Sequence, residues 1–252
     1  MKIVTEIKEW QFLRKKINSQ TIGFIPTMGN LHAGHLSLCE RSQQENALTV
    51  VSIFINPTQF NQAQDFQSYP RTLEQDKQLL ADKKIDYVLI PNAAAMYPEN
   101  FEIQVDETLL SQKLEGECRP GHFKGMLSVV TKLLCLVQAD AAYFGEKDFQ
   151  QLLLIKKMVA ALFIPTKIIA CETIRTAEGL ALSSRNSRLN QQQKEKAIQF
   201  ANILANKHYS LAEVKQKLTA LNISIDYIAE EWQRRLGAVW IDDVRLIDNI
   251  PI

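Results

Sequence analysis

The chain has 252 residues, of which 46% are hydrophobic and 23% charged, so it can bury an ordinary core in one large domain with a smaller companion. Its net charge of +1, from 29 basic and 28 acidic side chains, argues against an extended nucleic-acid-binding surface. The sequence contains no apolar run of the ~18 residues that span a bilayer and no signal peptide. From the charge balance we expect no nucleic-acid partner, and from the missing apolar run we expect no membrane partner.

Hydrophobic runs alternate with stretches of helical periodicity over the first 175 residues. The hydrophobic runs predict strands at 21–27, 47–56, 86–91, 141–145 and 166–172. The periodic stretches predict helices at 35–46, 71–85, 125–138 and 149–162, the second with Leu73, Leu79 and Leu80 facing inward. Continuously hydrophobic strands separated by helices predict an α/β fold, a doubly wound, Rossmann-like parallel sheet covered on both faces.

The composition changes after about residue 175. A polar, helical stretch at 183–222 is followed by strand-like segments at 223–229 and 237–248. We therefore expect a Rossmann-like domain over 1–175 and a small α+β domain over 176–252.

The segment PTMGNLHAGHLSL, at 26–38, places two glycines and two histidines where a predicted strand gives way to a helix. The first turn of a helix offers unpaired N–H groups and a positive dipole end, which favour an anion such as a phosphate. There His32 and His35 could donate hydrogen bonds to developing charge, or they could simply cap the helix or lie in the core. Zinc is disfavoured because a third ligand and the Glu of H-E-x-x-H are missing, and the chain has no Walker or G-x-G-x-x-G loop.

Polar segments also follow other predicted strands, at 56–61 and 145–151, and a further one lies at the domain junction, at 182–186. In an open parallel sheet, ligands bind beyond the carboxyl ends of the strands. The distribution of these segments therefore indicates a ligand site at that edge of the sheet.

Single residues in these segments have two interpretations each. Lys147, at a strand-to-helix turn, can reach a phosphate as a point charge, although a solvated loop lysine is the commoner case. The Ser-Ser-Arg of 183–185 can grip a phosphate or form an ordinary helix cap. The amides of Asn56 and Gln59 suit a polar or carboxylate-bearing substrate.

Seven motifs taken together are more specific than any one of them. In chain order they are PTMGNLHAGH, SIFINPTQF, YPRTLEQD, EGECRPGHFKGM, FGEKDFQQL, ALSSRN and RLIDN, and they extend over nearly the whole chain. They resemble the pantoate–β-alanine ligase family. The H-x-G-H core alone indicates only the wider nucleotidyltransferase superfamily, which includes class I aminoacyl-tRNA synthetases.

The resemblance implies roles for individual residues. It implies that His35, His32 and Lys147 are catalytic, and that Gln59 and Gln151 bind pantoate, with Gln59 also near β-alanine. The residues that it assigns to ATP are Met28, Gly29, Asn30, Leu31, His32, Ala33, Gly34, His35, Gly145, Glu146, Lys147, Asp148, Ile174, Leu182, Ser183, Ser184 and Arg185. Within this set, Ile174 would contact adenine by its backbone, and 182–185 would form a mobile phosphate loop. No residue is assigned as a metal ligand.

The sequence departs from the family pattern at a few positions. Leu182 stands where many relatives have Met, a volume-conserving exchange that should be nearly neutral. Where the family has an Asp-rich patch after YPRT, this chain has LEQD, which leaves Asp76 as the candidate for a magnesium-associated residue. For His122, a structural hydrogen bond is favoured over a catalytic role. The carboxyl-terminal part is expected to be shorter than is usual in the family, with one strand or turn missing.

The implied reaction joins pantoate and β-alanine at the expense of ATP and Mg²⁺, through a pantoyl adenylate, with release of AMP and pyrophosphate. The resemblance further implies a homodimer. Four scattered cysteines without a C-x-x-C pair are typical of free thiols in a reducing compartment, so we expect a cytoplasmic enzyme. The alternatives are another H-x-G-H nucleotidyltransferase acting on a different carboxylate or nucleotide-like substrate, and a nucleotide-sensing module without catalysis.

Overall fold

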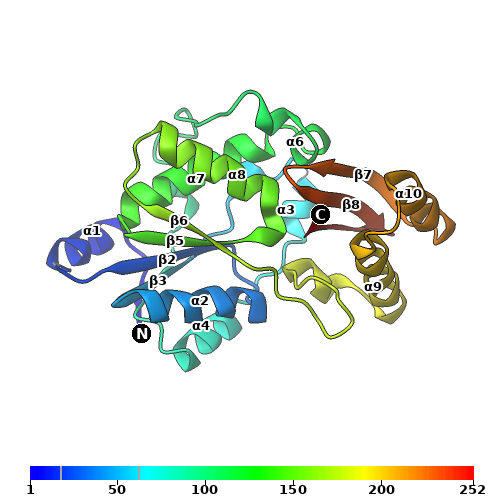
Figure 1. Cartoon of the computed structure of the whole chain (residues 1–252). Coiled ribbons are helices and arrows are strands. Elements are labelled where there is room, and N and C mark those ends of the chain that lie inside the picture. Colours follow the sequence, from blue (N-terminus) through cyan, green and yellow to red (C-terminus); the bar gives the residue numbers. More distant parts are fainter. Residues whose placement is uncertain (18, 62) are drawn as a thin grey trace. The chain divides into compact units, whose positions relative to one another are not determined.

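The computed structural model describes residues 1–17, 19–61 and 63–252, and the chain divides into two compact units (Figure 1). The first comprises Met1–Gly145 and Gln150–Cys171, and the second comprises Glu146–Phe149 and Glu172–Ile252. The division thus falls a few residues before the expected boundary at 175. It also assigns the short turn 146–149 to the second unit, although this turn directly follows the last residue of a strand of the first.

The first unit contains a six-stranded, wholly parallel sheet. Its strands are β1 (Lys2–Val4), β2 (Ile22–Thr27), β3 (Leu48–Ile53), β4 (Tyr87–Leu89), β5 (Ala141–Gly145) and β6 (Lys167–Cys171), in the order β1-β4-β3-β2-β5-β6. The predicted doubly wound sheet is therefore confirmed. The chain leaves β2 toward β3 on one side and reaches β5 on the other, so the strand order reverses between β2 and β5, where such sheets bind ligands.

Helices cover both faces of this sheet, with α7 and α8 on one face and α2 and α4 on the other (Figure 1). The helices of this part are α1 (Ile7–Lys16), α2 (Ala33–Glu45), α3 (Ala63–Gln67), α4 (Leu73–Asp82), α5 (Ala93–Met96), α6 (Glu115–Cys118), α7 (His122–Val137) and α8 (Phe149–Ala161), with 3-10 turns η1 (Pro57–Gln59) and η2 (Leu110–Gln112). Neither β1 nor α1 is among the predicted elements, because charged residues interrupt their apolar positions. Trp10 nevertheless buries its ring and donates an Nε1–H bond to the carbonyl of Leu136, 2.9 Å away, which joins α1 to α7.

The inward face of α4 differs from the prediction at one position. Leu80 is fully buried and Leu79 is packed against the same core, but Leu73 is 36% exposed. Leu73 lies in the first turn of α4, beyond the hydrophobic core, where the buried position is occupied by Asp76. The prediction that Leu73 faces inward is therefore wrong.

The second unit is a three-stranded antiparallel sheet covered by two helices. Its elements are η3 (Glu146–Asp148), η4 (Ser184–Arg188), α9 (Gln191–Ala205), α10 (Leu211–Ala220), β7 (Ser224–Glu231), β8 (Arg234–Ile241) and β9 (Val244–Pro251). Gly237 allows close packing here, because a Cβ at that position would lie 2.8 Å from Ile228 and 3.1 Å from Phe200. The expected strand-like segment at 237–248 is divided between β8 and β9 by a turn at Asp242, whose φ is +53°.

Across the described stretches, no helix combines the length and the hydrophobicity that crossing a bilayer requires.

Candidate active site

The turn that follows β2 is stabilised by a buried carboxylate from α4. Gly29 and Asn30 have φ values of +81° and +49°, so the backbone reverses sharply at this turn. The N–H groups of Asn30 and Leu31 donate to the two oxygens of Asp76, at 2.9 and 2.8 Å. Asp76 is 1% exposed and also accepts a bond from the Thr72 hydroxyl. Both carboxylate oxygens thus accept backbone N–H groups, which gives Asp76 a structural role, and its association with magnesium stays a prediction.

The two histidines lie at the amino-terminal end of α2, directly after this turn. His32 is the N-cap residue, and its Nδ1 accepts a bond from the N–H of Gly34 at 3.1 Å. The Nδ1 of His35 accepts a bond from the N–H of His32 at 3.3 Å, and the ring centroids are 4.1 Å apart. An imidazole whose Nδ1 accepts carries its proton on Nε2. The capping interpretation is therefore correct for the Nδ1 atoms, and both rings lie at a helix start, which favours anions.

Gln59 lies in η1, the turn beyond the end of β3, and is nine-tenths buried. Its Nε2 lies 3.1 Å from the Sδ of Met28, so the structure brings a predicted pantoate residue next to a predicted ATP residue. Its backbone carbonyl lies 2.8 Å from Nδ1 of His122, which supports the structural role favoured for that histidine. The segments that follow β2 and β3 thus contact each other at this edge of the sheet.

Asn56 has a different role from the one its amide suggested. Its side chain is completely buried: Oδ1 accepts from the hydroxyl of Tyr97 at 2.7 Å, and Nδ2 donates to Oε1 of Gln59 and to the carbonyl of Gly125, both at 3.1 Å. A Cβ on Gly125 would lie 2.2 Å from the carbonyl oxygen of Thr58, so only glycine allows α7 to approach η1 this closely. Asn56 is therefore occupied within the protein, and its function is to orient Gln59.

Two adjacent glutamines at the start of α8 differ in their hydrogen bonds. Gln150 is 2% exposed, donates to the carbonyls of Leu110 and Lys113 at 2.9 and 2.7 Å, and accepts from the N–H of Glu115 at 3.1 Å. Gln151 is half-buried, and among the described residues its amide has no hydrogen-bond partner. Within the described part of the chain, Gln150 thus has its amide occupied and Gln151 does not, and the binding of pantoate by Gln151 stays a prediction.

Among the other predicted ATP residues, Gly145 ends β5 of the first unit, and those at 146–148, 174 and 182–185 belong to the second unit. The N–H of Leu182 donates to the carbonyl of Ile174 at 2.9 Å, which joins two of them. The segment 174–182 also contacts β9, because Arg175 forms a bidentate ion pair with Asp248 at 2.7 and 2.8 Å. This pairing raises the pKa of Arg175. Ser183 caps η4, because its Oγ accepts from the N–H of Arg185 at 3.3 Å.

Lys147 lies in η3, and its side chain is 16% exposed. Its Nζ lies 3.9 Å from Oδ1 of Asp148, too far for a hydrogen bond. An ammonium group without a tightly bound counter-ion retains its attraction for a phosphate.

A doubly wound sheet with a histidine-bearing, helix-opening turn at its switch point is the arrangement of a nucleotide-binding α/β enzyme. The family model for pantoate-beta-alanine ligase matches residues 2–251, and the chain belongs to that family.

Relatives and solved structures agree with this assignment. A pantothenate synthetase of Coxiella burnetii (strain RSA 493) is 49% identical over 99% of this chain and 96% of its own length. One of Legionella pneumophila (strain Philadelphia 1) is 48% identical over 99% of both chains, so the carboxyl-terminal part is not shortened relative to that protein, contrary to expectation. A Francisella tularensis pantoate-beta-alanine ligase, complexed with beta-gamma ATP and beta-alanine, matches with a TM-score of 0.96, 43% identity and coverage of 100% and 97% of the two chains. A pantothenate synthetase from Thermus thermophilus matches with a TM-score of 0.91, 38% identity and coverage of 100% and 99%.

Proposed function

We propose that the chain joins pantoate to β-alanine in two chemical steps at one site. The carboxylate of pantoate attacks the α-phosphorus of ATP, and pyrophosphate leaves, which gives a pantoyl adenylate. The amine of β-alanine then attacks the activated carbonyl carbon and loses a proton, and AMP leaves. A free carboxylate is a poor acceptor for an amine, so adenylation supplies the leaving group. Membership of the ligase family and the ATP- and β-alanine-complexed Francisella relative support this reaction.

The observation that carries the mechanism is the pair of imidazoles at the start of α2. The Nδ1 atoms of His32 and His35 both accept backbone N–H groups, which fixes the two rings at the helix start, and we assign their Nε2–H groups as donors to the phosphates of ATP. Negative charge grows on the α-phosphate and on the departing pyrophosphate, and donors fixed in advance stabilise it. Lys147 adds a positive charge for the phosphate tail. No covalent enzyme intermediate is needed, and catalysis rests on positioning and on charge stabilisation.

The ligands are assigned to the residues as follows. Gln59 and Gln151 bind pantoate, and Gln59 also lies at the β-alanine position. ATP binds along 28–35 and 145–148, with the backbone of Ile174 at adenine and 182–185 at the phosphates. In support, the amide of Gln151 is available and the amide of Gln59 is held beside Met28.

Magnesium enters this scheme with the nucleotide. Within the described part of the chain no three His, Cys, Asp or Glu side chains are grouped as a metal site, and Asp76 is bound to backbone N–H groups. Mg²⁺ is commonly held by substrate phosphates together with water rather than by a protein cage. We therefore write the substrate as Mg-ATP and assign no protein ligand to the metal.

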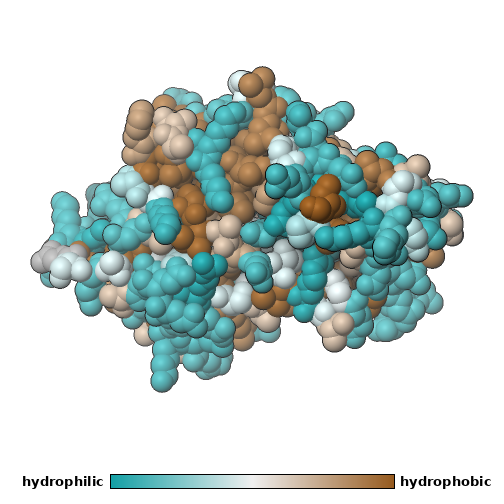
Figure 2. Space-filling view, in the orientation of Figure 1, coloured by the Kyte–Doolittle hydropathy of each residue, from teal (hydrophilic) through white to brown (hydrophobic). Residues whose placement is uncertain are grey.

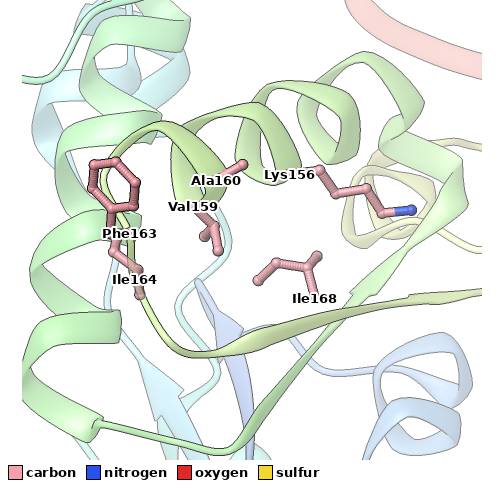
Figure 3. A pocket seen from close by; sticks show the side chains of 6 residues that line it. All are labelled: Lys156, Val159, Ala160, Phe163, Ile164 and Ile168. Carbon is pink, nitrogen blue, oxygen red and sulfur yellow. The ribbon is translucent and has the colours of Figure 1, made fainter.

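We also propose a homodimer, formed through an apolar face of the first unit. Phe163 is 91% exposed and Leu109 74%, and the segments that carry them are joined by the ion pair of Lys157 with Glu107. Figure 2 shows apolar side chains gathered over α7 and α8, and Figure 3 shows Val159 and Ile168 lining a hollow beside α8 and β6. Exposed apolar side chains gathered on one face are typical of an association surface, and β6 is an edge strand. The occupant we infer is a second copy of the chain.

In the described part of the chain the four cysteines form no disulfide, which is typical of a reducing compartment and supports the cytoplasm as the site of the reaction.

The test of the function is to incubate the protein with Mg-ATP, pantoate and β-alanine and to identify the nucleotide product. AMP together with pyrophosphate supports ligation through an adenylate. ADP would instead show phosphoryl transfer, and no turnover with pantoate would favour an H-x-G-H enzyme for another carboxylate. Pantoate alone should drive exchange of labelled pyrophosphate into ATP. If this exchange required β-alanine, a separate adenylation step would have to be abandoned.

A further inference from the structure

The turn that carries Lys147 is held by two side chains of the carboxyl-terminal strands. Asn249, on β9, is buried, and its Nδ2 donates to the carbonyls of Glu146 and Lys147 at 3.0 and 2.8 Å. Its Oδ1 accepts from Nη1 of Arg234, on β8, at 2.7 Å. Two carbonyl partners on one side and a guanidinium on the other fix the orientation of the amide.

Arg234 holds the two ends of the same turn. Its Nη2 forms a charge-assisted bond with the carboxylate of Glu146, and its guanidinium carbon lies 4.2 Å from the ring centroid of Phe149. Arg234 thus contacts the residue before Lys147 and the residue after Asp148. The carboxylate of Glu146 also neutralises the positive charge of Arg234. Without this partner, Arg234 would compete with Lys147 for an anion.

We propose that Asn249 and Arg234 are positioning residues for Lys147, and this inference rests on the phosphate-binding role proposed for that lysine. Neither is assigned to a substrate. They determine the course of the backbone on both sides of the Lys147 Cα, and hence the place from which its ammonium reaches out. A lysine side chain is long and flexible, so the fixed part of its position comes from its backbone.

Asparagine is specifically suited to this place. Aspartate would direct carboxylate oxygens at two carbonyl oxygens, and alanine would leave both carbonyls without their donor. The neighbouring Arg235 offers a matched control. It is as buried as Asn249, but it bonds to Glu230 and to the carbonyls of Asn206 and Tyr209, away from the turn.

The first experiment measures pantoate-driven ATP–pyrophosphate exchange on the full chain, beside melting curves. Asn249→Ala and Arg234→Gln should slow exchange on the order of 10- to 100-fold, because small displacements of a catalytic group cost factors of this size. Arg235→Gln should lower the melting temperature but leave the exchange rate of the folded protein nearly unchanged. A loss of rate with Arg235→Gln equal to that with Arg234→Gln would overturn the proposal, because it would be a general effect of a weakened unit.

The second experiment repeats Asn249→Ala in a Lys147→Ala background. The second change should then cost little, since Asn249 acts through Lys147. Equal losses in both backgrounds would overturn the proposal. If Lys147→Ala alone left exchange unaffected, the proposed role of Lys147 would itself be wrong, which is a distinct result.

Amide hydrogen exchange gives a readout independent of activity. The peptide that contains residues 146–150 should exchange faster in Asn249→Ala than in the unaltered chain, and no faster in Arg235→Gln. Unchanged protection of this peptide in Asn249→Ala would contradict the proposal. Should Asn249→Ala fail to fold, Arg234→Gln supports the same comparisons.

Discussion

Asp76 accepts a hydrogen bond from the backbone N–H of Leu31 at 2.8 Å, although the two residues are 45 positions apart. The same carboxylate binds the N–H of Asn30, so a residue of α4 determines the shape of the turn that leads into His32 and α2. The position of the histidine pair therefore depends on a helix that contributes no ligand of its own.

Asp76→Asn should destabilise the protein and slow adenylation. An amide has one acceptor oxygen in place of two, so one buried N–H loses its partner, at a cost of about 1–3 kcal/mol of unfolding free energy. Denaturant unfolding and pyrophosphate exchange measure the two effects. The control is Glu74→Gln on the same helix, whose ion pair with Lys77 is at the surface and should matter little. Equal unfolding midpoints for the two variants would contradict this interpretation of Asp76.

His35→Ala should slow adenylate formation by about 100- to 1000-fold, or about 3–4 kcal/mol of transition-state stabilisation. Its melting temperature should change little, because His35 is half-buried and water can replace its bond to the N–H of His32. Attack of β-alanine on adenylate supplied ready-made should be nearly unaffected, since pyrophosphate has already left. Rapid-quench assays of the two half-reactions measure this, with the exposed His208→Ala as control. Normal adenylation by His35→Ala would show that the imidazole is only a cap.

Gln151→Ala should raise the KM for pantoate more than that for ATP. A polar substrate group buried without its partner costs about 1–3 kcal/mol. Its neighbour provides the contrast: Gln150→Ala removes three internal bonds and should lower the unfolding free energy by a similar amount without a selective effect on pantoate. Steady-state kinetics and urea unfolding of both variants separate the two roles. Equal increases of both KM values in Gln151→Ala would mean that this residue only supports the fold.

Replacing Leu109 and Phe163 together by serine should shift the protein from dimer to monomer in light scattering at micromolar concentration. Both side chains are largely exposed in the single chain, and their apolar area is the inferred driving force for association. Phe12→Ser changes another exposed apolar residue, on α1 and outside this face, and should leave the mass unchanged. A dimer that persisted in the double variant would place the interface elsewhere.

Much of this architecture could be predicted from local pattern. Strands such as 141–145 are continuously hydrophobic because both faces of a parallel sheet are covered, and the predicted bounds agree with β5. The turn 28–35 could be predicted as well, because Gly29, which has a positive φ, and the start of α2 lie within a few residues of each other. By contrast, β1 and α1 could not be predicted, since short elements that charged residues interrupt give a weak periodic signal.

The sequence by itself determined the family, the doubly wound sheet and the candidates for phosphate contact, because each depends on residue types at short spacing. Only the tertiary structure decided which polar side chains are available and which are already occupied. Gln150 and Gln151 are adjacent and have the same chemistry, yet the amide of Gln150 is occupied by internal hydrogen bonds. The amide of Asn56 is likewise occupied, by Tyr97, Gln59 and Gly125. The partners of Asp76 and Asn249 are likewise far away in the chain, at separations of 45 and 103 residues for the bonds to Leu31 and Glu146. A hydrogen bond requires that its two atoms lie close together in space. For segments so far apart in the chain this proximity is set by the tertiary fold, and the local sequence does not predict it.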